Sequence, residues 1–148
     1  MKILNTVYII TVVSALLGCV TPQANHSTLP GRPLNAYKYV VVLAPTYEGS
    51  VVDQYGVASK MEQMFQDKGL VVLSHEAGMS LDGPQKAQLI ICGISHNHTQ
   101  DGFGGSYATV KLSVLNTFGE TVYSGTGRYQ GLSIIDDLAG ASSEAFKG

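Results

Sequence analysis

The chain has 148 residues, which is enough for one domain of ordinary size and too short for two. Nine Lys and Arg against 11 Asp and Glu give a formal net charge of −2, a balance that excludes a basic nucleic-acid-binding protein. Hydrophobic residues make up 45% of the chain, so wholesale disorder is excluded as well. The composition predicts one small globular domain with one hydrophobic core.

The first residues have the pattern of a secretory signal. One cation, Lys2, precedes an apolar stretch that runs from Val7 to Leu17 and is interrupted only by Thr11 and Ser14. A membrane-spanning helix needs roughly 17–25 apolar residues, and this stretch is too short for that. We therefore expect residues 1–18 to be a signal peptide.

The apolar stretch ends in the tetrad Leu16-Leu17-Gly18-Cys19. This tetrad resembles the lipobox of bacterial lipoproteins, in which a small residue precedes the cysteine that is lipidated and becomes the new N-terminus. The resemblance implies a covalent lipid on Cys19 and stable attachment to a membrane; we expect no other cofactor. Val20 follows the cysteine, where Asp resembles an inner-membrane retention signal, so the periplasmic side of the outer membrane is favoured.

The cysteines leave one alternative open. Cys19 and Cys92 are the two cysteines of the chain, and in a secreted protein they could form a disulfide. Cys92 lies inside the apolar run 89–94. If Cys19 carries a lipid, the sequence predicts that Cys92 is a buried, unreactive thiol.

Residues 19–35 are interpreted as the lipidated N-terminus and a flexible tether. Pro22, Pro30 and Pro33 stand among polar residues there, and neither helical nor strand periodicity is present. The tether would keep a single globular domain, residues 36–148, close to the lipid headgroups.

The first half of this domain predicts a strand, a helix and a second strand. Residues 36–44 are rich in β-branched and aromatic side chains, which is typical of a buried strand. Residues 51–68 repeat apolar side chains every three or four positions, which predicts an amphipathic helix with Ser50 as its cap and Gly69 after its end. Residues 70–73 predict the next strand, parallel to the first.

The second half predicts three more strands and a helix. After a loop over residues 76–86, residues 87–95 are apolar on both faces, as in a central strand. Residues 106–116 and 120–129 predict a hairpin in which Asn116 pairs with Gly119. The last helix is expected over residues 136–147, with Asp136 as its cap and Asp137 near its positive end.

The order β-α-β-β-β-β-α predicts a two-layer α/β (α+β) sandwich, with a mixed sheet of about five strands and both helices on one face. Over residues 37–146 this order resembles the periplasmic domains of small envelope lipoproteins. These are the curli-secretion lipoprotein, the lipoprotein activators of peptidoglycan synthases and the N-terminal domain of the translocation protein TolB. The resemblance is architectural and carries no functional residue; it implies a partner-binding role in envelope assembly.

Two histidines form the sharpest cluster of candidate ligands. His96 and His98 follow the predicted central strand at i and i+2, so their side chains would project from one face roughly 6.6–6.8 Å apart along the chain. That spacing allows them to share a metal ion, with Asp101 from the next loop or His75 from another strand as further ligands. The alternative is a pair of exposed histidines at a strand end.

The hairpin register defines a candidate binding surface. One face of the hairpin is apolar and includes Gly125 and Gly127, which would make room for a helix. The other face places Tyr107 beside Arg128 and Lys111 beside Ser124, with no helix assigned to cover it. Tyr and Arg are frequent at binding hot spots, so this surface is a candidate partner site; the alternative is an ordinary solvated face.

The sequence favours a binding protein over an enzyme. It contains no GxSxG motif, and Asp136 and Asp137 at i and i+1 of a helix do not face one another. We expect a lipid-anchored module of the cell envelope that binds a protein or peptidoglycan partner and no nucleic acid. The alternative is a periplasmic metal-binding lipoprotein that uses His96 and His98.

Overall fold

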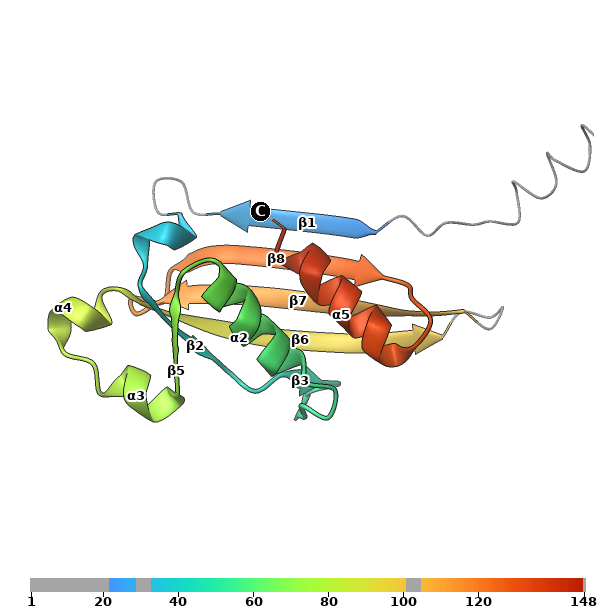
Figure 1. Cartoon of the computed structure of the whole chain (residues 1–148), viewed down its shortest axis with the longest axis horizontal. Helices are drawn as coiled ribbons and strands as arrows, with labels where there is room; N and C mark the ends of the chain where they lie inside the picture. Colours follow the sequence, from blue (N-terminus) through green and yellow to red (C-terminus); the bar gives the residue numbers. More distant parts are fainter. Residues whose placement is uncertain (1–21, 29–32, 101–104, 148) are drawn as a thin grey trace, which may run out of the picture.

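The computed structural model describes residues 22–28, 33–100 and 105–147. A single sheet of eight strands has the order β1-β8-β7-β6-β2-β5, and the short β3–β4 hairpin joins it at β6 (Figure 1). The strands are β1 (Gln23–Thr28), β2 (Tyr39–Val42), β3 (Thr46–Tyr47), β4 (Ser50–Val51), β5 (Val71–Leu73), β6 (Leu89–Gln100), β7 (Ser106–Asn116) and β8 (Thr121–Tyr129). The helices are the 3-10 turn η1 (Leu34–Ala36), α2 (Val57–Asp67), α3 (His75–Met79), α4 (Gly83–Lys86) and α5 (Ile134–Ala145).

The predicted combination of helices with one mixed sheet is confirmed, but the sheet has eight strands and not about five. The strands β2, β5, β7 and β8 lie within the predicted segments, whereas β6 extends beyond the predicted residues 87–95 to Gln100. The three additional strands are β1, β3 and β4, of which the last two have two residues each. The parallel pairing of β2 with β5 agrees with the predicted crossover through a helix.

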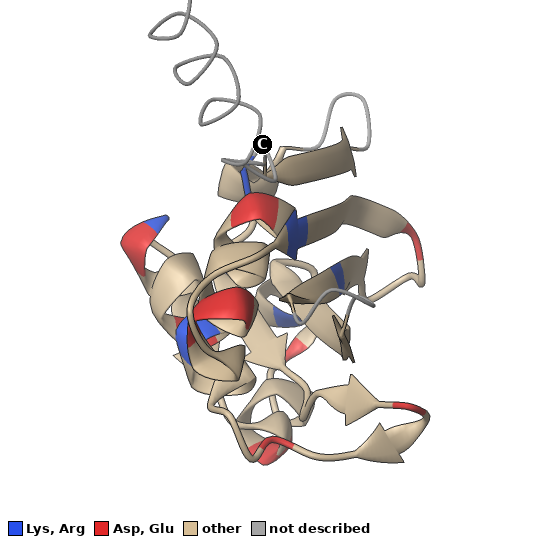
Figure 2. Ribbon diagram, turned by 90° about the vertical axis from the view of Figure 1, so that its right-hand side faces the viewer, with Lys and Arg blue, Asp and Glu red and all other residues tan. Residues whose placement is uncertain are grey.

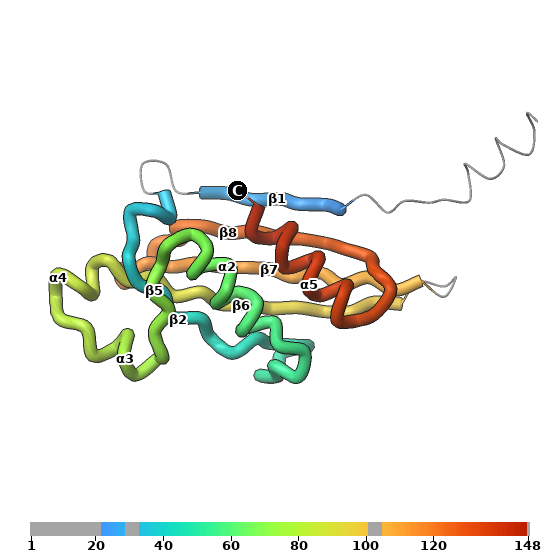
Figure 3. Tube along the Cα trace, viewed as in Figure 1, coloured from blue at the N-terminus to red at the C-terminus, as the bar shows by residue number. Residues whose placement is uncertain are grey.

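Both long helices, α2 and α5, lie on one face of the sheet, as expected (Figures 1 and 3). The core between the layers includes Met61 and Phe65 of α2 and Leu138 and Ala141 of α5, all of them buried. Phe65 meets Phe146 edge to face with ring centroids 4.8 Å apart, which joins the two helices.

The first helix begins later than the sequence predicts. Ser50, the expected cap, and Val51 belong to β4, because the chain reverses through Glu48 and Gly49, whose φ angles are 49° and 82°. The helix α2 instead begins after Gly56. At its other end Gly69 takes the expected left-handed conformation, with a φ of 86°.

The predicted loop over residues 76–86 contains the two short helices α3 and α4. Ser74 and Asp82 cap them, accepting hydrogen bonds from the backbone amides of Ala77 and Gln85. Gly78 of α3 lies against Val41, whose side chain points away from the core that holds Val40. The helix α3 therefore covers the β2 region of the second face of the sheet.

The predicted flexible tether is wrong for residues 23–28. They form β1, which pairs antiparallel with β8 over its whole length, from Gln23 opposite Arg128 to Thr28 opposite Tyr123. Almost every side chain of β1 is exposed, so the strand depends on backbone pairing with β8 and shows no apolar alternation.

The β7–β8 hairpin has a different register from the predicted one. Val114 lies opposite Tyr123 and Val110 opposite Gly127, a shift of two residues, and a bulge follows Val114. Because side chains alternate with a period of two, this shift keeps the predicted apolar and polar faces. Gly125 and Gly127 do face α5, as expected: a Cβ atom on Gly127 would lie 2.0 Å from the carbonyl oxygen of Ala141.

We predict that Gly127→Ala lowers the free energy of unfolding by about 1–3 kcal/mol or more, because α5 must move away from β8. The matched control is Gly93→Ala in β6, where the nearest atom to an added Cβ is 3.7 Å away. Urea unfolding of both variants measures the difference. Equal stabilities would contradict the close approach of helix and sheet.

Candidate functional site

Among the described residues, no helix covers the second face of the sheet where β6, β7, β8 and β1 lie side by side (Figure 1). The side chains on this face alternate with those that contact α5. They are mostly hydroxyl and amide groups: Asn25, Ser27, Ser95, Asn97, Thr99, Tyr107, Thr109, Lys111, Ser113, Ser124, Thr126 and Arg128. We call this set the open face.

The open face brings together the three residues that the sequence singled out for binding, Tyr107, Lys111 and Arg128. The Arg128 guanidinium carbon lies 3.6 Å from the centroid of the Tyr107 ring, a close cation–π contact. The predicted cross-strand partners are corrected by the register: Arg128 lies opposite Thr109, and Lys111 lies opposite Thr126. The contact with Tyr107 is therefore diagonal.

The Arg128 side chain is half-buried against the Tyr107 ring. Its Nε atom is buried and has no hydrogen-bond partner within the described part of the chain. A cation held against an aromatic ring presents a rigid flat surface, with little side-chain entropy left to lose on binding.

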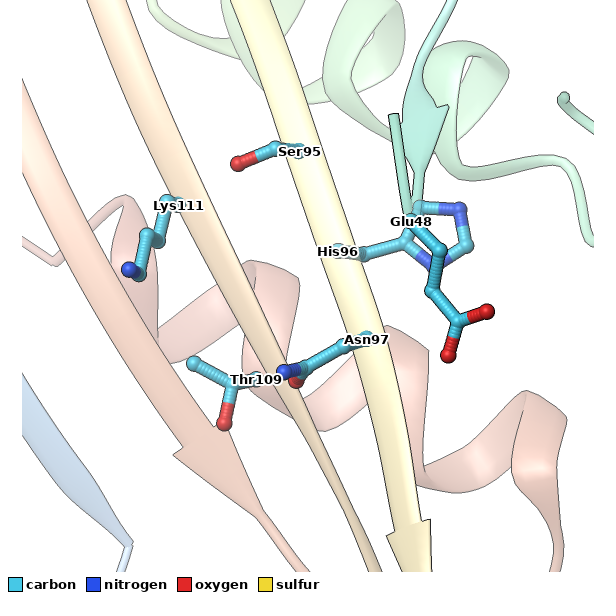
Figure 4. Close-up of a pocket in the computed structure, with 6 residues that line it drawn as sticks. All are labelled: Glu48, Ser95, His96, Asn97, Thr109 and Lys111. Atoms are coloured by element: carbon cyan, nitrogen blue, oxygen red, sulfur yellow. The ribbon is translucent and has the colours of Figure 1, made fainter. Parts of the chain in front are cut away.

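Next to this pair the open face is hollowed (Figure 4). The hollow has a volume of about 250 Å³, and Ser95, Asn97, Thr109 and Lys111 line it. The β3–β4 turn places Glu48 at its rim, as Figure 4 shows. Glu48 was not predicted from the sequence, although Gly49 after it is a turn signal that could have indicated the hairpin.

The two histidines lie in β6, but their surroundings differ from both expectations. His96 is buried, and its ring stacks on Tyr47 with centroids 5.4 Å apart. Neither ring nitrogen has a hydrogen-bond partner of normal geometry among the described residues. Burial lowers the pKa of His96 below its ordinary value of 6.5, while the backbone of Val52 and the carboxylate of Asp53 act in the opposite direction.

His98 takes part in a buried polar network at the start of α5. Its Nε2 atom lies 2.9 Å from a carboxylate oxygen of Asp137, and the Ser106 hydroxyl donates to the same oxygen at 3.0 Å. The backbone amide of Gly131 donates to the other oxygen of Asp137. The predicted cap role of the aspartates is corrected: Ser133 caps α5, and Asp137 is fully buried.

The described residues contain no group of three or more His, Cys, Asp or Glu side chains that could hold a metal ion. His75 begins α3 and does not lie on a strand, and Asp101 is outside the described residues. Cys19 and the rest of the lipobox-like tetrad are outside them as well.

Cys92 is a free, buried cysteine in the central strand β6. Burial raises the pKa of its thiol to about 12. The same core holds Tyr123, whose hydroxyl donates a hydrogen bond to the carbonyl of Ala145 at 2.5 Å. Burial is the main cause that raises the pKa of Tyr123 to about 12. Cys92 therefore has the expected environment of an unreactive structural thiol.

Comparison with known proteins gives a fold and no family. No family model matches the chain, and no curated protein matches it. Among solved structures, the PelC dodecamer from Paraburkholderia phytofirmans and the dodecamer of a PelC point variant from the same organism each match with a TM-score of 0.59 and 12% sequence identity. Each match covers 84% of this chain and 94% of the PelC chain. At this identity the likeness shows a shared fold alone.

We predict that His96 makes the protein less stable as the pH falls. Its pKa is lowered in the folded state, so between pH 6.5 and that lower pKa the unfolded state binds more protons. The free energy of unfolding should therefore decrease as pH falls through this window. His96→Phe should weaken this dependence, as measured by urea unfolding at several pH values.

The matched control is His26→Phe, since His26 is exposed on β1. This variant should keep the pH dependence of the unmodified protein. If His96→Phe also keeps it, protonation of His96 is not coupled to folding.

Proposed function

We propose that this chain is a lipid-anchored module of the cell envelope that binds a partner through the open face. The observation that carries the proposal is a broad sheet face, rich in hydroxyl and amide groups and left uncovered by α2 and α5. Its Tyr107–Arg128 pair combines the two residue types that dominate many binding interfaces. The partner is an envelope protein or the cell wall.

The lipid anchor is supported by the sequence. The tetrad Leu16-Leu17-Gly18-Cys19 follows a secretory pattern, and its lipobox-like cysteine would carry the lipid on the periplasmic side of the outer membrane. Among the residues that the structure describes, no helix is long and apolar enough to cross a membrane. The anchor is therefore proposed from the sequence.

Further copies of the same chain are the first partner to test. Two solved structures that share the fold are dodecamers of PelC, which supports self-association as a property compatible with this architecture. An oligomer in which each copy uses its open face would bury the Tyr107–Arg128 pair within an interface.

Binding is proposed in preference to catalysis because of how the polar network is connected. The Ser106 hydroxyl donates to Asp137 and not to His98, so this histidine is not placed to activate the serine. Metal binding by His96 and His98 has no observation in its favour, because Asp137 already occupies the Nε2 atom of His98.

The open face is tested with the double variant Tyr107→Ala/Arg128→Ala of the full chain, purified in detergent. We expect self-association to weaken by about tenfold or more, as for a hot-spot pair, in sedimentation-velocity experiments. The matched control is Lys38→Ala, which removes the cation of a second cation–π pair, with Tyr39.

Three results would contradict parts of this proposal. Unchanged association of the double variant would exclude the Tyr107–Arg128 pair as an interface. A collapse of its thermal stability would show that the pair belongs to the core. A monomeric unmodified protein at all concentrations would exclude a second copy as the partner.

The anchor is tested with Cys19→Ala. The altered protein should lose the lipid label and leave the membrane fraction, because the thiol of Cys19 is the proposed attachment point. Membrane fractionation and metabolic labelling with a fatty acid measure both effects. Retention in the membrane with an unchanged label would contradict lipidation at this residue.

A further inference from the structure

The two ends of the sheet differ in how close they can come to the proposed lipid anchor. Only residues 20–22 separate Cys19 from Gln23, the first residue of β1. Four Cα–Cα steps span at most about 14 Å, so Cys19 lies within that distance of Gln23. The tether is thus much shorter than the segment 19–35 that the sequence predicts, because β1 fixes residues 23–28 to the domain.

The end of the sheet near Gln23 is also the end at which α5 begins. Gln23 lies opposite Arg128, and the chain then runs from the end of β8 at Tyr129 into α5 at Ile134. Figures 1 and 3 show the start of β1 and this connection at the same end of the molecule. We call it the anchor end.

The anchor end exposes two large aliphatic side chains. Leu132, in the connection before α5, is 100% exposed, and Ile135, in the first turn of α5, is 60% exposed. Leu132 and Ala139 also line a hollow beside α5, which has a volume of about 450 Å³. Exposed aliphatic side chains grouped at one place indicate a contact surface.

We propose that Leu132 and Ile135 contact the lipid bilayer and seat the anchor end on the membrane. The inference rests on the proposed lipid anchor at Cys19, which is at most about 14 Å along the chain from Gln23 at this same end. Because this span is an upper limit, the anchor end can settle on the bilayer, where burial of exposed aliphatic side chains at the boundary between headgroups and acyl chains is favourable.

The charges at the anchor end suit an uncharged lipid surface. Asp136, the exposed carboxylate next to Ile135, accepts a hydrogen bond from the Ser133 hydroxyl at 2.8 Å. Figure 2 views the molecule from this end and shows ribbon segments of Lys and Arg interspersed with those of Asp and Glu. The contact is therefore with a zwitterionic lipid such as phosphatidylcholine, and it depends on apolar burial and not on charge attraction.

The test compares two labelled variants of the full-length lipidated protein in phosphatidylcholine vesicles, Leu132→Cys and Phe118→Cys. Phe118 is a matched control because it is 74% exposed and lies in the β7–β8 turn, at the far end of β8. The nine residues of β8 separate the two positions by roughly 30 Å. Both side chains are exposed, so neither substitution removes a core contact.

Each introduced thiol is labelled with an environment-sensitive fluorophore in the folded protein, since Cys92 is buried and its thiol pKa is about 12. Quenchers carried on the lipids then report depth. We expect the label at position 132 to be quenched several-fold more strongly than the label at position 118. Equal quenching on vesicle-bound protein would overturn the bilayer contact while leaving the anchor intact.

Failure of the anchor gives a different result. If the unsubstituted protein does not float with the vesicles, the lipid anchor is excluded. The bilayer contact that rests on the anchor is then overturned too. Flotation is therefore measured first on the same preparations.

Discussion

The close approach of α5 to β8 is the constraint on which the rest of the molecule depends. Gly125 and Gly127 have no Cβ, and an added Cβ on either would lie about 2 Å from a backbone carbonyl of α5. Tyr123 then reaches the carbonyl of Ala145 near the end of the helix. Because α5 packs so closely on this face, the core forms between them. The second face of β6, β7, β8 and β1 is then accessible to solvent or to a partner.

A buried carboxylate fixes where that helix starts. Asp137 has no exposed surface, and a charge without partners in such a place would cost several kcal/mol. His98, Ser106 and the amide of Gly131 supply the partners from β6, β7 and the connection before α5. The network thus joins the ends of two strands to the first turn of α5, and it holds the connection that carries Leu132 in one position.

The features that the sequence predicted correctly are those encoded by local periodicity. The alternation along β7 separated the two faces, and it survived a register error of two residues because the period is two. The continuous apolar run around Cys92 predicted a strand buried on both faces, and so a buried thiol. The C-terminal end of α2 was predicted correctly because Gly69 favours the left-handed backbone conformation that ends a helix.

The features that could not be predicted from the sequence depend on contacts between segments far apart in the chain. The strand β1 is exposed on nearly all its side chains, so its pairing with β8 leaves no pattern in the sequence. Asp137 looked like a helix-terminal charge, and its burial depends on His98 and Ser106, which lie 39 and 31 residues away. The open face was predictable from alternation, but its hollow required Glu48 from the unpredicted β3–β4 turn.

The two proposals together give the domain an orientation. If the anchor end rests on the bilayer, the long strands β6, β7 and β8 run away from the membrane, because all three have one end there. The open face is parallel to these strands. It would therefore stand roughly perpendicular to the membrane surface, with its side chains directed along that surface and toward neighbouring molecules. A second copy held by its own lipid would meet the open face by diffusing in two dimensions, and the shared orientation would reduce the rotational entropy lost on association.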